Sequence, residues 1–174
     1  AGVIGLGTMV HAGHFGPMKD EESLSAIEAA LELGVNFVDT SDAYGAGYSE
    51  TLLGKALKGK RDKAILATKW CPHHIKKPAT KAVFIAQLDA SLQHLQTDHV
   101  DVLFNHQMGP NDGVSRGNNF SRLDNPELWE AWETVKKAGK ARFFGVSGHE
   151  GNLMEVMNHV VDSGKFDVIL CRYS

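Results

Sequence analysis

The chain has few cysteines and little net charge. Only two of its 174 residues are cysteines, Cys71 and Cys171, and they are far apart in the sequence. Neither belongs to a Cys-x-x-Cys pair, which argues against a disulfide framework and favours a reducing, cytoplasmic setting. The formal net charge is −3 at pH 7. No electrostatic feature therefore points to a nucleic acid or an anionic membrane surface as a partner.

Long apolar segments are also missing. No run approaches the roughly 18 residues that a membrane-spanning helix needs, and the first residues do not resemble a signal peptide. We therefore expect no membrane association. The content of 43% hydrophobic and 22% charged residues is ordinary for a globular domain.

The chain does contain a regular alternation of strand-like and helix-like segments. Apolar stretches typical of buried strands cover residues 2–7, 35–39, 64–69, 100–106, 142–147 and 166–170. Five segments between them carry apolar residues at helical spacing, and Asp20, Ser49, Thr80 and Asn125 are candidate helix N-caps. This order predicts an α/β fold with a parallel sheet. Alternation alone leaves two architectures open: an open doubly wound sheet, or a (β/α)8 barrel cut short.

Polar side chains gather where the predicted strands end. The second strand ends at Asp39, with Tyr44 five residues later, and the next three end at Lys69, His106 and Ser147. In parallel α/β folds, functional groups collect at the carboxyl ends of the strands. Each residue alone has an ordinary explanation as a loop cap, a rim aromatic or a surface group. Together they indicate a site, because ionisable groups are costly to bury unpaired.

These residue types suit carbonyl reduction. Adjacent strands lie about 4.8 Å apart, so Asp39 can form an ion pair with Lys69. A lysine cation beside a tyrosine favours the phenolate and eases proton exchange, and a histidine can orient a carbonyl oxygen through a hydrogen bond. No activated serine or cysteine nucleophile accompanies them. We therefore expect proton donation to an oxygen, with hydride supplied by a cofactor.

Several segments taken together resemble the aldo-keto reductase family. Residues 39–45 (DTSDAYG), followed by Ser49-Glu50 and Leu53-Gly54, resemble the family signature DTAxxYGxSExxLG, with a longer loop after Gly45. The stretch 97–106 resembles the family's TDYVDLLxxH pattern. Thr68-Lys69 and Gly145-Val146-Ser147 resemble its lysine strand and its GVSN stretch. The resemblance runs in order through nearly the whole chain.

The resemblance implies a (β/α)8 TIM barrel that binds NADP(H) at the carboxyl ends of its strands. It implies that Tyr44 is the catalytic acid–base, that Asp39 and Lys69 modulate it, and that His106 orients the carbonyl. The cofactor-binding positions that it implies are Gly7, Thr8, Met9, Asp39, Ser147 and Gly148.

The function implied by the resemblance is reduction of an aldehyde or ketone to an alcohol, with hydride from NADPH and a proton from Tyr44. The alternative is an NADP-binding regulatory subunit of the same fold with little turnover. A larger redox protein with further cofactor domains is a third possibility. The expected partner is a small carbonyl compound; neither the substrate nor the oligomeric state is readable from the residues.

Some positions depart from the family's pattern. Gly148 stands where asparagine is usual, and Leu170 stands about where glutamine is common, so two contacts to the nicotinamide carboxamide lose their usual residues. Gln107 replaces an aromatic residue in the expected substrate wall. The long polar segment 108–124 is predicted to be a substrate loop.

Two further expectations follow from counting. Cys71, His73 and His74 are too few ligands for a closed zinc site, so we expect no metal. About six βα units are readable, whereas a closed barrel of this type needs eight. We therefore expect residues 1–174 to form a single barrel domain that is incomplete at its C-terminus.

Overall fold

The structure is a computed structural model, which describes residues 2–13, 16–71, 79–106, 122–148 and 153–172. In these residues, strands and helices alternate as predicted. The strands are β1 (Gly5–Gly7), β2 (Phe37–Asp39), β3 (Ile65–Trp70), β4 (Val100–Asn105), β5 (Ala141–Gly148) and β6 (Val168–Cys171). The α-helices are α1 (Asp20–Glu32), α2 (Tyr48–Ala56), α3 (Lys81–Leu95), α4 (Pro126–Lys137) and α5 (Leu153–Ser163).

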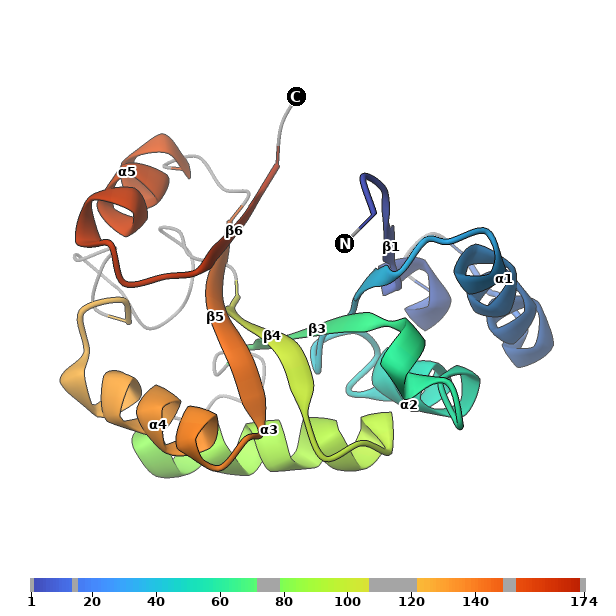
Figure 1. The fold of residues 1–174 in the computed structure, drawn as a ribbon, viewed down its shortest axis with the longest axis horizontal. Coiled ribbons are helices and arrows are strands. Elements are labelled where there is room, and N and C mark those ends of the chain that lie inside the picture. Colours follow the sequence, from blue (N-terminus) through green and yellow to red (C-terminus); the bar gives the residue numbers. More distant parts are fainter. Residues whose placement is uncertain (1, 14–15, 72–78, 107–121, 149–152, 173–174) are drawn as a thin grey trace.

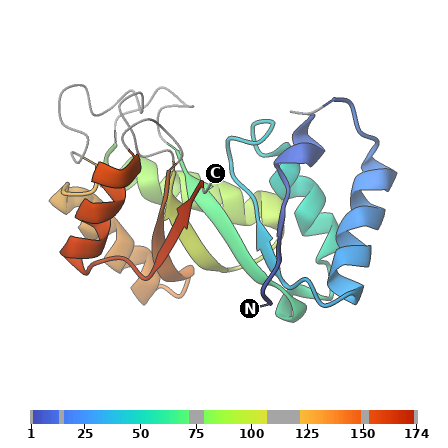
Figure 2. The same ribbon diagram turned by 90° about the horizontal axis from the view of Figure 1, so that it is seen from above.

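The strands form one sheet in chain order, β1-β2-β3-β4-β5-β6, and every neighbouring pair is parallel. Figure 1 shows that this sheet curls and carries its helices on the outer face, with β1 and β6 on either side of the open concave side. In the view from above, α1 and α2 lie at one end of the curve and α4 and α5 at the other (Figure 2). A doubly wound sheet would reverse its strand order and carry helices on both faces. The fold is therefore a curled part of a (β/α)8 barrel.

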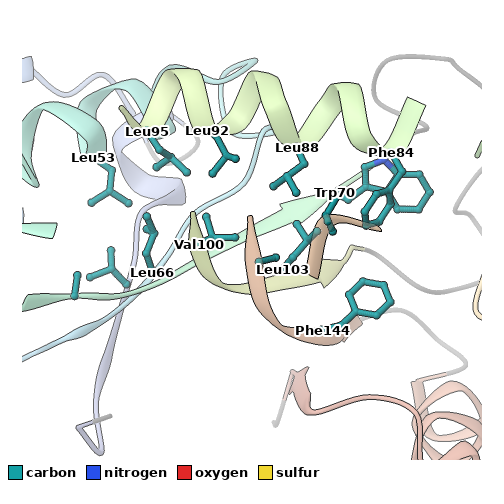
Figure 3. Packing of buried hydrophobic residues seen from close by; sticks show 14 of the residues in the cluster. Leu53, Leu66, Trp70, Phe84, Leu88, Leu92, Leu95, Val100, Leu103 and Phe144 are labelled. Atoms are coloured by element: carbon teal, nitrogen blue, oxygen red, sulfur yellow. The ribbon is translucent and has the colours of Figure 1, made fainter. Parts of the chain in front are cut away.

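The main hydrophobic core lies between the sheet and the helices. Leu88 and Leu92 of α3 point toward the strands that carry Leu66 and Leu103 (Figure 3). Helix α3 packs between α2 and α4. Burying each large aliphatic side chain stabilises the fold by about 1.5–3 kcal/mol, so this layer holds the strand ends in fixed positions.

The predicted site lies at the carboxyl edge of the sheet's concave face. Successive side chains of a strand point to opposite faces. A small apolar cluster on this face contains Phe37 of β2, Ala67 of β3 and Phe104 of β4. The residues two positions further along these strands are Asp39, Lys69 and His106. Strand alternation therefore aims all three polar side chains to the same side at the carboxyl edge.

Two of the four predicted helix N-caps are confirmed. The Thr80 hydroxyl accepts a hydrogen bond from the Val83 N–H at 3.3 Å, and the Asn125 side chain accepts one from the Glu127 N–H at 2.9 Å. The predictions for Asp20 and Ser49 are wrong. Helix α1 already begins at Asp20, so its N-cap is Lys19. Helix α2 begins at Tyr48, and the Ser49 hydroxyl is buried inside the first turn, where it contacts another loop.

The ends of the strands differ from the predicted ones by a few residues. Strands β1 and β2 begin later than expected, at Gly5 and Phe37. The N–H of Gly2 donates to the Asn36 side chain at 2.8 Å instead of entering the sheet ladder. Among the described helices, none is long and apolar enough to span a bilayer.

Candidate active site

Lys69 lies at the centre of the predicted site. Its side chain comes from β3 and is 2% exposed. The ammonium donates to Asp39 Oδ2 at 2.6 Å, to the main-chain oxygen of Thr40 at 2.6 Å and to the Tyr44 hydroxyl at 3.1 Å. An ammonium has three N–H donors, so these three acceptors satisfy the buried cation. Lys69 thereby joins the end of β2 to the loop that carries Tyr44.

The two carboxylate oxygens of Asp39 differ in their hydrogen bonds. Oδ2 accepts from Lys69, whereas Oδ1 is buried and has no hydrogen-bond partner among the described residues. Burial raises the pKa of the Asp39 carboxyl, and the neighbouring Lys69 cation opposes that rise. The open oxygen can accept a hydrogen bond from a hydroxyl or amide group of a ligand.

Tyr44 and His106 complete the predicted group of four. The ring of Tyr44 meets the ring of His106 edge-on, with centroids 6.0 Å apart and planes at 88°. His106 follows β4 and is buried. Its main-chain N–H donates to the main-chain oxygen of Trp70 at 3.0 Å. The structure therefore brings Asp39, Tyr44, Lys69 and His106 together from two strand ends and two loops. Such a cluster can hold a carbonyl oxygen between a phenol and an imidazole.

The residues predicted to contact a cofactor lie on both sides of this cluster. Gly7 pairs in register with Asp39, and the Thr8 N–H donates to the Asp39 main-chain oxygen at 2.9 Å. Ser147 and Gly148 end β5, so β2, β3 and β4 separate them from Gly7 and Thr8. The buried Ser147 hydroxyl has no partner in the part of the chain that the structure describes. That hydroxyl can form a hydrogen bond with an amide group of a ligand.

A network of buried hydroxyls links the two loops of the site. Thr8 Oγ1 donates to the main-chain oxygen of Asp39 at 3.0 Å, and Thr40 Oγ1 donates to Ser49 Oγ at 3.1 Å. Ser49 Oγ in turn lies 2.9 Å from the main-chain oxygen of Thr8 and 2.8 Å from its hydroxyl. These contacts fix the start of α2 to the end of β1. Sequence reasoning placed Thr40 and Ser49 in a family signature but assigned this contact to neither.

Comparison with known proteins agrees with this geometry. Residues 3–172 match the model of the Aldo/keto reductase family. The chain belongs to that family. The aldo-keto reductase YhdN of Bacillus subtilis (strain 168) is 35% identical over 164 residues, which cover 90% of this chain and 46% of that protein. The L-galactose dehydrogenase of Arabidopsis thaliana is 33% identical over 178 residues, 98% of this chain and 52% of that protein.

Solved aldo-keto reductases share the arrangement of strands. AKR11C1 from Bacillus halodurans, in its holo form, superposes with a TM-score of 0.73 at 29% identity, covering 98% of this chain and 53% of its own. An aldo/keto reductase from Klebsiella pneumoniae in complex with NADP and acetate gives a TM-score of 0.71 at 29% identity, covering 95% and 52%. The chain thus spans about half the length of the relatives it matches.

Arg122 lies at this candidate site, although the sequence analysis did not identify it. It falls in the segment predicted to be a substrate loop, of which residues 108–121 lie outside the described residues. Arg122 is 1% exposed, and its Nη2 donates to the main-chain oxygen of His106 at 2.7 Å. Its guanidinium also lies 5.9 Å from the ring of Trp70. Arg122 therefore supports the backbone of His106. No local sequence pattern predicts this role.

The remaining sequence-based expectations concern metal ligands and the substrate wall. Across the described segments, no three His, Cys, Asp or Glu side chains group as a metal site would require. Cys71 is buried and forms no disulfide within the described residues, whereas His73, His74 and Gln107 lie outside those segments. Leu170 pairs in register with Ser147, so an apolar side chain stands beside the open hydroxyl.

Proposed function

We propose that this chain is part of an NADPH-dependent oxidoreductase that reduces an aldehyde or ketone to an alcohol. The observation that carries the proposal is the position of the Lys69 ammonium, which contacts both the Asp39 carboxylate and the Tyr44 hydroxyl. The Klebsiella relative was solved with NADP, which supports the same cofactor here.

The proposed roles follow from the contacts. Tyr44 donates its hydroxyl proton to the carbonyl oxygen as negative charge develops there. The Lys69 cation stabilises the phenolate that remains, and Asp39 holds Lys69 in place so that the buried cation is paired. His106 donates a hydrogen bond that orients the carbonyl oxygen. The bound cofactor would supply the hydride.

We further propose that the cofactor is held at both sides of this cluster. Gly7, Thr8 and Met9 would lie along it after β1, and the Asp39 carboxylate would face it. Ser147 and Gly148 would face the nicotinamide carboxamide from β5. The support for this assignment is that Ser147 Oγ and Asp39 Oδ1 are buried acceptors without partners among the described side chains, since buried polar atoms are normally hydrogen-bonded.

The other expectations remain proposals. We propose that residues 1–174 belong to one barrel domain, because all six described strands share one sheet. The proposed partner is a small carbonyl compound, and the net charge of −3 gives no reason to propose a nucleic acid. A cytoplasmic location stays a prediction.

The test is a matched pair of tyrosine substitutions. Tyr44→Phe removes the proposed proton donor and is expected to lower kcat about 10²- to 10⁴-fold for a reactive aldehyde, with nucleotide affinity nearly unchanged. Tyr48→Phe is the control, because Tyr48 is exposed on α2 and its hydroxyl donates to the Asp20 carboxylate. NADPH consumption at 340 nm measures turnover. A Tyr44→Phe variant nearly as fast as the parent would overturn the assignment.

The same experiment separates an enzyme from a regulatory subunit. Nucleotide binding can be followed by tryptophan fluorescence, since Trp70 is adjacent to Lys69 in the sequence. A regulatory subunit would bind NADPH but would not consume it with any aldehyde or ketone of a broad panel. An enzyme would show both signals.

A further inference from the structure

The Ser41 hydroxyl lies among three hydrogen-bonding groups. It accepts from the Ala43 N–H at 3.2 Å, lies 3.2 Å from Asp42 Oδ1 and lies 3.2 Å from His106 Nδ1. Ser41 is fully buried and His106 is 4% exposed. Solvent therefore has little access to the contact between the Ser41 hydroxyl and the His106 ring.

Proton counting restricts how these groups can be arranged. A hydroxyl has one proton to donate, so Ser41 can donate either to Asp42 or to His106, and the other group must donate to Ser41. An ionised Asp42 can only accept, so it takes the Ser41 proton and His106 must carry a proton on Nδ1. In a neutral imidazole Nε2 is then an acceptor.

One additional proton shared by Asp42, Ser41 and His106 reverses the direction of these hydrogen bonds. If the proton sits on Asp42 Oδ1, that carboxyl donates to Ser41, and Ser41 donates to Nδ1, which leaves the imidazole proton on Nε2. If the proton sits on His106 instead, the imidazolium carries protons on both nitrogens. In both cases Nε2 is a donor. Loss of that single proton to solvent converts Nε2 into an acceptor.

The surroundings of Asp42 favour the arrangement with Oδ1 facing Ser41. Gln87 of α3 donates its side-chain amide to Asp42 Oδ2 and to the main-chain oxygen of Cys71, the latter at 3.4 Å. Oδ2 is thus an acceptor, and a proton belongs on Oδ1. Glu50 of α2 faces Asp42 with like charge, and Lys69 of β3 lines the same small internal void.

We propose that Asp42, acting through the Ser41 hydroxyl, controls whether Nε2 of His106 carries the proton that it needs to orient a carbonyl. This inference rests on the proposed function in one respect only: the role of the Nε2 proton in orienting a carbonyl. Asp42 and Ser41 are positioning residues here, since they act on the substrate only through His106. Burial, with a smaller effect of the Glu50 charge, raises the pKa of Asp42 to about 7. Both arrangements are therefore populated near neutral pH.

The test reads the tautomer of His106 directly. In protein with 15N-labelled histidine, long-range 1H–15N correlations distinguish Nδ1–H from Nε2–H, and His106→Asn identifies the signal. At pH 9 we expect the proton on Nδ1. Asp42→Asn should move it to Nε2 at the same pH, because the amide nitrogen facing Ser41 donates and the Ser41 proton is released to Nδ1. Asp62→Asn, an exposed carboxylate outside this cluster, should leave the tautomer unchanged.

A second variant keeps the test decisive. Ser41→Ala removes the hydroxyl that joins Asp42 to His106 in the described residues, so adding Asp42→Asn to it should cause no further change at His106. Identical tautomers in the parent and in Asp42→Asn at pH 9 would overturn the proposal, as would an Asp42 effect that persists without Ser41. These spectra can be recorded whether or not the protein has catalytic activity. A protein that lacks reductase activity but shows the tautomer shift would refute the proposed function and leave this inference standing.

The kinetic consequence provides an independent readout. If Nε2 must donate, kcat/KM of the parent should fall about tenfold for each pH unit above about 7. Asp42→Asn should flatten this decline without changing the affinity for NADPH. A purely structural role of Asp42 would instead lower activity by a similar factor at every pH.

Discussion

The Lys69 ammonium lies 2.6 Å from Asp39 Oδ2, and the two side chains are only 2% and 16% exposed. Removing one partner of a buried pair leaves an uncompensated charge, which typically costs about 3–5 kcal/mol. We predict that Asp39→Ala lowers the free energy of unfolding by about that amount. Urea unfolding monitored by circular dichroism measures it.

The double variant separates stability from chemistry. In Asp39→Ala/Lys69→Met neither charge remains, so a large part of the lost stability should return. Reductase activity should not return, because no cation is left beside Tyr44. Equal destabilisation in the single and double variants would mean that packing of Asp39, rather than its charge, holds the strand end.

Asp42 should make the stability of the fold depend on pH. Its pKa is about 7 in the folded chain, against an ordinary value of 3.8. Below pH 3.8 both folded and unfolded chains are protonated at this group. As the pH rises from there to about 7, the unfolded chain ionises first, so the folded state loses stability, by at most about 4 kcal/mol.

The measurement compares two substitutions of Asp to Asn across this window. Asp42→Asn removes the titrating group, so its stability relative to the parent should rise between pH 4 and pH 7.5 and then level off. The control Asp62→Asn should differ from the parent by a constant amount. A stability difference for Asp42→Asn that is flat with pH would contradict the prediction.

The sequence predicted the parts of this site that depend on strand order. Asp39, Lys69 and His106 were found because parallel strands bring their carboxyl ends to one edge, and alternation with period two sends these side chains to one face. The choice between an open sheet and a barrel was not available from the alternation, because both architectures use the same order of strands and helices. The order of strands in space decided it.

The missed contacts all depend on tertiary neighbours. Ser49 was predicted to cap a helix, yet its hydroxyl meets Thr8, a partner 41 residues away. The hydroxyl of Ser41 contacts His106, 65 residues away. A hydroxyl bonds to whichever polar atom the fold brings near, so local sequence cannot name that partner. The buried Arg122 is a similar case.

Two glycines of the sheet should respond differently to the same substitution. A Cβ at Gly145 would lie 2.6 Å from the ring of Phe104 and 2.7 Å from the main-chain oxygen of Val168, whereas a Cβ at Gly7 would meet nothing within 4 Å. We predict that Gly145→Ala costs about 1–3 kcal/mol, the usual effect of overpacking. Gly7→Ala should leave stability nearly unchanged.

The same pair tests the proposed cofactor path. The space beside Gly7 is open in the described structure, and we propose that the nucleotide uses it. Gly7→Ala should therefore raise the dissociation constant for NADPH although its unfolding curve matches the parent. Unchanged nucleotide affinity in Gly7→Ala would remove Gly7 from the set of cofactor contacts.

Ser147 and Ser23 offer a matched comparison for the nicotinamide contact. Both hydroxyls are buried and lack partners among the described residues, but Ser147 ends β5 and Ser23 lies in α1. A neutral hydrogen bond contributes about 0.5–1.5 kcal/mol net. Ser147→Ala should therefore weaken NADPH binding by about 2- to 12-fold, whereas Ser23→Ala should not change it. Fluorescence titration of both variants gives the two dissociation constants. If Ser147→Ala binds NADPH as tightly as Ser23→Ala does, the Ser147 hydroxyl does not contact the nucleotide, and the cofactor assignment at β5 must be abandoned.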